Sequence, residues 1–165
     1  MNKITALIAF VCLGTLDFFR TLAGGVAIQA NAVVPGTVGQ SPGCITRSAE
    51  VALASEHLLL KPGTAANEVD ICGANDLPIG WNDDEAVIDT NTNVNLLGSA
   101  FETAVLTASG NVAIGDPVYT AAAGRVSTLS AIAGTYYQVG VALSAAADGE
   151  EVEVDPCLAR KEVVV

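Results

Sequence analysis

The chain has 165 residues, which suits one domain with a buried core, and its formal charge of −11 repels nucleic-acid phosphates and argues against DNA or RNA binding. The apolar fraction is 51% but aromatic residues make up only 5%, so the hydrophobicity comes mostly from small and branched aliphatic residues. With 16 glycines among them, this composition favours short strands and tight turns over long helices.

The first predicted element is an apolar run over residues 4–16, which imitates a secretory signal. It is too short to span a bilayer, which takes about 20 residues, and the nearest Ala-x-Ala, at 30–32, lies far beyond it. We therefore expect a retained segment and no membrane association. It forms a short amphipathic helix or an extended arm, and it either docks on a larger surface or packs on its own core.

The amino-acid composition changes at residue 24, and Gly, Pro and small residues are frequent from there to residue 43. Such a segment predicts extended, irregular chain. We therefore expect two parts, an N-terminal segment and arm over 1–43 and a β-rich domain over 44–165.

Strand-like stretches recur about every ten residues in the second part, as in antiparallel sandwiches and small barrels. In this part, only residues 100–108 could form a short helix in place of a strand. The prediction is an all-β fold, a small antiparallel β-sandwich or barrel with an extended N-terminal arm or short helix. The stretches that carry it are 45–54, 55–63, 67–76, 91–110 (two strands), 112–129, 136–146 and 150–158.

Turn signals divide these strands. Gly115 and Asp116 predict a turn that Pro117 stiffens, and the chain reverses again at Gly124 and Arg125. Val118 and Tyr119 should therefore enter a strand between two reversals.

Two acidic clusters follow different patterns. Residues 83–85 are three consecutive acids after Trp81, which indicates a loop. Glu151, Glu153 and Asp155 alternate with apolar residues, which places the acids on the solvent face of a strand and the valines in the core. Neither cluster has the spacing of a calcium loop.

Catalytic and metal-binding motifs are missing from the sequence. His57, the one histidine, lies in SEHLLLKPG, and we expect a solvated turn or strand-end side chain there. The four cysteines form no Cys-x-x-Cys pair, so we expect free, mostly buried thiols, with disulfides as the alternative. These observations predict no enzyme, no metal and no cofactor. The cysteines are Cys12, Cys44, Cys72 and Cys157.

The stretches DLPIGWNDDEAV, NLLG, TASGNVAIGDPVYTAAAGRVS and GTYYQVGVALSAAADGEEVEV resemble, in this order, the capsid decoration or cement proteins of tailed bacteriophages. The resemblance covers about half the chain. It implies a structural virion protein, made in the host cytoplasm, that binds the outer capsid surface as a trimer and clamps major capsid subunits without catalysing a reaction.

The contact with the capsid or a sister subunit is expected to use large apolar side chains. Six lie in the N-terminal segment and one precedes the acidic triplet: Ile4, Leu7, Phe10, Leu16, Phe18, Phe19 and Trp81. The alternative function is a secreted or surface-anchored β-rich adhesin or coat protein, in which the N-terminal run is a signal or anchor and the cysteines are paired.

Overall fold

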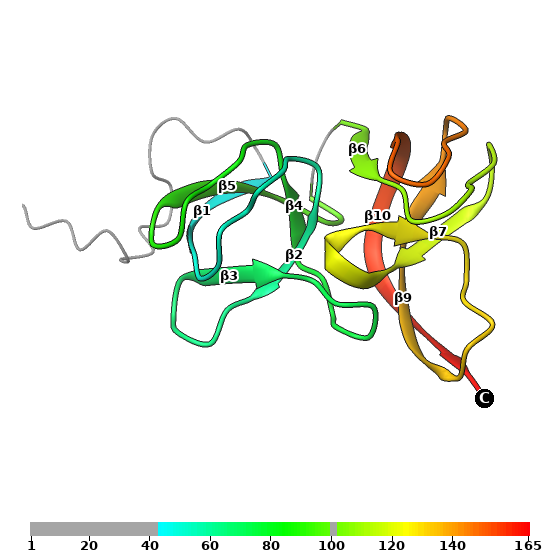
Figure 1. Cartoon of the computed structure of the whole chain (residues 1–165), viewed down its shortest axis with the longest axis horizontal. Helices are drawn as coiled ribbons and strands as arrows, with labels where there is room; N and C mark the ends of the chain where they lie inside the picture. Colours follow the sequence, from blue (N-terminus) through cyan, green and yellow to red (C-terminus); the bar gives the residue numbers. More distant parts are fainter. Residues whose placement is uncertain (1–42, 100–101) are drawn as a thin grey trace, which may run out of the picture. The chain divides into compact units, whose positions relative to one another are not determined.

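A computed structural model of the chain describes residues 43–99 and 102–165. The predicted N-terminal arm, and with it the 43/44 boundary between the two parts, lies outside or at the edge of this range. The described residues form two β-structures, a closed five-stranded barrel followed by a five-stranded sheet (Figure 1). The predicted all-β fold is therefore confirmed.

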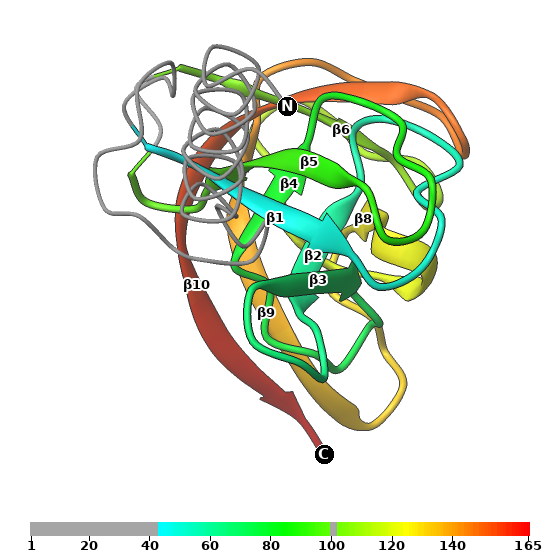
Figure 2. The same cartoon turned by 90° about the vertical axis from the view of Figure 1, so that its left-hand side faces the viewer.

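The barrel has the strand order β1-β3-β2-β4-β5 and closes because β5 pairs with β1. Figure 2 shows β1 between β5 and β3. All neighbours are antiparallel except β1 and β3, which pair in parallel and depart from the purely antiparallel prediction. The strands are β1 (Cys44–Ala49), β2 (Leu59–Pro62), β3 (Glu68–Ile71), β4 (Gly80–Asn82) and β5 (Asn91–Leu96).

The second sheet has the order β6-β10-β9-β7-β8, with antiparallel neighbours throughout. Its longest strand, β10, pairs with β9 along most of its length and with β6 only near its start (Figure 1). Val152 and Val154 are fully buried while Glu151, Glu153 and Asp155 are exposed, so the predicted alternation is confirmed. The strands are β6 (Ala104–Thr107), β7 (Pro117–Thr120), β8 (Val126–Ser127), β9 (Gly134–Ala142) and β10 (Glu151–Val164).

The helical alternative for residues 100–108 does not hold for its described part, because residues 104–107 form β6, in line with the strand candidates over 91–110. Ala104 and Leu106 are fully buried, and Val105 lies opposite Glu153 of β10. A short apolar run fits a strand and a helix equally well by periodicity. Pairing with β10 decides between them, since it satisfies the backbone and buries alternate side chains.

The turns around β7 lie where the sequence predicts them. Gly115 has φ of +86°, and the turn is closed by the backbone N–H of Asp116, which donates to the oxygen of Ala113 (3.1 Å). Gly124 ends the short 3₁₀ turn η1 (Ala122–Gly124) with φ of +72°. A Cβ at Gly124 would lie 2.9 Å from the backbone oxygen of Leu59, so the close approach to the barrel also requires glycine.

Barrel and sheet share one hydrophobic core. Leu59, Cys72 and Trp81 of the barrel part belong to the same buried cluster as Leu106 and Val152 of the sheet. Two backbone hydrogen bonds reinforce the junction, from the N–H of residue 107 to the oxygen of residue 57 (3.0 Å) and from the N–H of residue 124 to the oxygen of residue 72 (2.7 Å). We therefore expect barrel and sheet to fold together. A second cluster fills the barrel itself: Ala49, Leu53, Leu60, Val69 and Val94.

Candidate interaction surfaces

Six of the seven predicted contact residues lie outside the described residues: Ile4, Leu7, Phe10, Leu16, Phe18 and Phe19. The seventh, Trp81, is the middle residue of β4, and its side chain is only 2% exposed. The indole packs in the core that joins barrel and sheet. Its burial is thus explained within the chain, and the structure does not present it to a partner.

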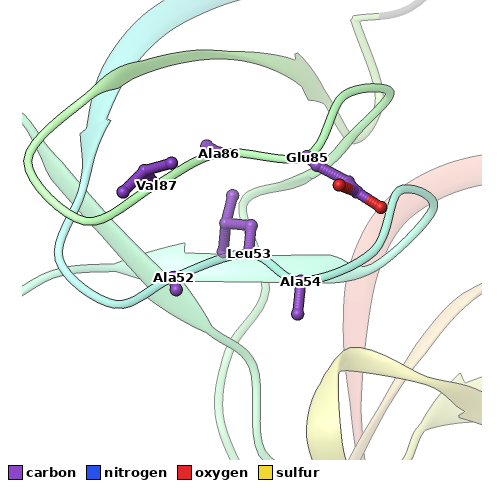
Figure 3. Close-up of a pocket in the computed structure, with 6 residues that line it drawn as sticks. All are labelled: Ala52, Leu53, Ala54, Glu85, Ala86 and Val87. Carbon is purple, nitrogen blue, oxygen red and sulfur yellow. The ribbon is translucent and has the colours of Figure 1, made fainter.

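An open apolar groove lies between the segment after β1 and the loop after β4 (Figure 3). Leu53 and Ala86 exchange two backbone hydrogen bonds, of 2.8 and 3.0 Å, and the buried Leu53 side chain lies between the two segments. The groove encloses about 360 Å³, and Val87 on its rim is 67% exposed. Apart from the carboxylate of Glu85, this surface offers only van der Waals contact. Its lining is Ala52, Leu53, Ala54, Glu85, Ala86 and Val87.

The acidic triplet at residues 83–85 lies in the exposed loop between β4 and β5, as the sequence predicts. The loop is fixed from inside by Asn82, which is fully buried. Its side-chain amide donates to the backbone oxygens of Ser55 (2.9 Å) and Asp84 (2.8 Å), and its Oδ1 accepts from the N–H of Leu58 (2.9 Å). One polar side chain therefore sets the position of two loops at once.

The outer face of the second sheet carries the other acidic cluster. Glu151, Glu153 and Asp155 are exposed on β10, and Val141 of β9 lies opposite Asp155 with 38% exposure. Glu153 accepts a hydrogen bond from Thr103 Oγ1 (2.9 Å). This face combines negative charge with exposed aliphatic surface.

His57 is placed differently from the sequence expectation. It lies in a bend before β2, so the turn position is right, but its side chain is only 19% exposed and its Nδ1 lies 3.0 Å from Glu151 Oε1. The two residues are 94 positions apart in the chain. No local pattern in the sequence signals this contact, which only the packing of barrel against sheet creates.

Lys61 and Asp76, whose pKa values are both shifted, lie near the buried thiol of Cys72, which follows β3. The Lys61 ammonium lies 2.8 Å from Asp76 Oδ2 and 3.4 Å from Asp70 Oδ2. Its hydrogen bond, followed by one from the N–H of Gly73, lowers the pKa of Asp76. Burial raises the pKa of the Cys72 thiol to about 12. Cys72 and Cys157 are free thiols, as expected, but of these two only Cys72 is buried, and Cys12 lies outside the described residues.

Within residues 43–99 and 102–165, the structure contains no helix of the length and apolarity that crossing a membrane requires. Three exposed surfaces stand out among these residues: an apolar groove, an acidic loop and an acidic sheet face. Exposed surfaces of this kind are suited to contacts with other proteins.

Comparisons with known proteins identify the family of this chain and a solved structure with a similar fold. The chain belongs to the phage cement protein family, whose model matches residues 48–156, more than half of the sequence. Its fold is similar to that of the N base of the head fiber gp8.5 in bacteriophage phi29, with a TM-score of 0.57 and 18% sequence identity over 74% of this chain and 99% of that chain. A comparison with curated protein sequences finds no match.

The resemblance seen in the sequence is therefore confirmed. The family is one of structural phage proteins, so this chain is a capsid-associated structural protein and a virion component.

Proposed function

We propose that this protein binds the outer surface of a phage capsid and cements it by contacting neighbouring major capsid subunits. The observation that carries the proposal is the family match over residues 48–156, which covers most of the barrel and most of the second sheet. The same match favours this function over the secreted adhesin.

Stabilisation follows from mass action. A ligand that binds the assembled shell and not the dissociated subunits lowers the free energy of the shell by RT ln(1 + [L]/Kd) per site. At a free concentration of 100 Kd this amounts to about 2.7 kcal/mol per site. Many such sites on one shell add up to a large resistance to disassembly.

A homotrimer is part of the proposal. Three linked copies raise the effective concentration of each further contact once the first has formed, so the assembly dissociates more slowly than a single copy. The exposed aliphatic residues of the described part, such as Val87, Val141 and Leu158, provide apolar area for contacts between copies or with the shell.

The N-terminal segment is our candidate for the shell contact, because the six predicted contact residues in it lie within 16 positions, from Ile4 to Phe19. Burial of one such side chain stabilises a contact by roughly 1.5–3 kcal/mol. The family match begins at residue 48, so the segment lies outside the part of the chain that the family model covers.

The test is a deletion of residues 1–24, assayed by co-sedimentation with heads of the parent phage that lack this protein. The proposal expects that full-length protein saturates the heads and that the truncated protein stays in the supernatant. The far-UV circular dichroism of both proteins should show the same β-content, which separates loss of the contact from loss of the fold. Full occupancy by the truncated protein would reject the arm as the shell contact, and no sedimentation of the full-length protein would reject the proposed function.

A further inference from the structure

Three potential metal ligands meet where the barrel part contacts the second sheet. Glu56 and His57 come from the segment between β1 and β2, and Glu151 is the first residue of β10. One ligand atom from each of the three side chains lies within 4.8 Å of the other two. The sequence motifs and the family match do not explain this grouping.

The imidazole is the best-positioned member of the group. The backbone N–H of His57 donates to the oxygen of Asn82 (2.9 Å), and its backbone oxygen accepts from the N–H of Thr107 (3.0 Å). Barrel and sheet therefore both hold this residue. Its φ of +64° belongs to the left-handed region, which the two hydrogen bonds maintain. With Nδ1 directed at Glu151, the ring needs little rearrangement to act as a ligand.

The donor set selects the kind of ion. One imidazole nitrogen and two carboxylate oxygens suit Zn²⁺, whereas Mg²⁺ and Ca²⁺ prefer all-oxygen sites. At zinc–ligand distances of about 2.0–2.2 Å, tetrahedral ligand atoms lie roughly 3.3–3.5 Å apart. The 3.0 Å between His57 Nδ1 and Glu151 Oε1 is close to this spacing. Rotation of the exposed Glu56 side chain can bring its carboxylate oxygen to a similar distance from these two atoms.

We propose that Glu56, His57 and Glu151 form a zinc site, with water completing the coordination. Zinc takes the place of the hydrogen bond between His57 and Glu151, and any proton on Nδ1 leaves to solvent when the ion binds. The ion balances two of the acidic charges of the chain and links the segment before β2 to β10. It is therefore expected to stabilise the junction of barrel and sheet.

The direct test is a titration of the full-length protein with zinc chloride, followed by NMR of the imidazole. The chain has one histidine, so one imidazole resonance reports on the site without ambiguity. We expect this resonance to shift and to saturate at one equivalent of zinc, with no such shift from magnesium or calcium. Zinc bound at cysteine thiols or at other carboxylates would leave the resonance unmoved, and that result would overturn the proposal.

Variants identify the other ligands by isothermal titration calorimetry. His57→Asn removes the nitrogen ligand and retains a residue that tolerates positive φ, while Glu56→Gln and Glu151→Gln weaken the oxygen ligands. Each should lower the zinc affinity at least tenfold. Asp155→Asn is the matched control, because Asp155 is also exposed on β10 and lies outside the cluster, and it should bind as wild type does. Unchanged affinity in Glu151→Gln would contradict the site even if His57→Asn failed to fold.

Discussion

Replacement of Trp81 by alanine tests whether barrel and sheet form one cooperative core. Trp81 is 2% exposed and belongs to the cluster that contains Leu59 of the barrel and Leu106 of the sheet. Truncation of a buried tryptophan to alanine costs about 3–5 kcal/mol. A typical domain is stable by about 5–15 kcal/mol, so the variant should lose a large part of its stability, and its Tm should fall by roughly 10 °C.

Urea unfolding followed by far-UV circular dichroism measures the change. Leu77→Ala is the control, because Leu77 is 53% exposed and its truncation should change the free energy of unfolding by less than about 0.5 kcal/mol. A loss below about 1 kcal/mol for Trp81→Ala would refute the placement of Trp81 in the core.

Unfolding of the wild-type chain provides a second test of whether barrel and sheet share one cooperative core. Its one tryptophan lies in the barrel, and its three tyrosines, Tyr119, Tyr136 and Tyr137, lie in the second sheet. Tryptophan fluorescence and the near-UV signal of the tyrosines should therefore follow the same urea transition. Two separate midpoints would show that barrel and sheet unfold independently.

Three further predictions concern polar and titratable groups. Asn82→Ala should destabilise the protein by about 3 kcal/mol or more in urea unfolding, because it leaves three backbone groups without their amide partner; a change below about 1 kcal/mol would contradict this. The lowered pKa of Asp76 means that its stabilising effect exists above the usual carboxyl range and disappears as the pH falls through that lowered value. Asp76→Asn should therefore lower Tm at pH 7 and leave it unchanged near pH about 2; an equal loss at both pH values would exclude the ion pair as the cause. Because burial raises the pKa of Cys72 to about 12, its thiol should react with iodoacetamide at pH 8 only after unfolding, which peptide mass spectrometry detects; labelling of Cys72 in the native protein would oppose its burial.

The local patterns of the sequence predict much of the fold. The alternation of acids and valines at the start of β10 gives both the strand and its buried face, because side chains on a strand alternate between two faces. The turns at Gly115 and Gly124 follow from residues that accept positive φ. These features depend on neighbours in the chain, so one sequence is enough to find them.

Features that depend on distant parts of the chain are harder to predict. The parallel pairing of β1 with β3 and the closure of the barrel arise from contacts between separate strands, and β6 becomes a strand only through β10. Trp81 lies just before three acids, which suggests a surface position, yet all three residues of β4 are buried and Trp81 packs in the core that joins barrel and sheet. The contact of His57 with Glu151 likewise has no local signal.

Cryo-electron microscopy of heads assembled with and without this protein tests the proposed cement function most directly. The account predicts additional density on the outer surface of the shell, at symmetry-related positions that bridge neighbouring major capsid subunits, and the barrel and sheet should fit that density. Identical outer surfaces in the two samples, or added density only inside the shell, would contradict the account.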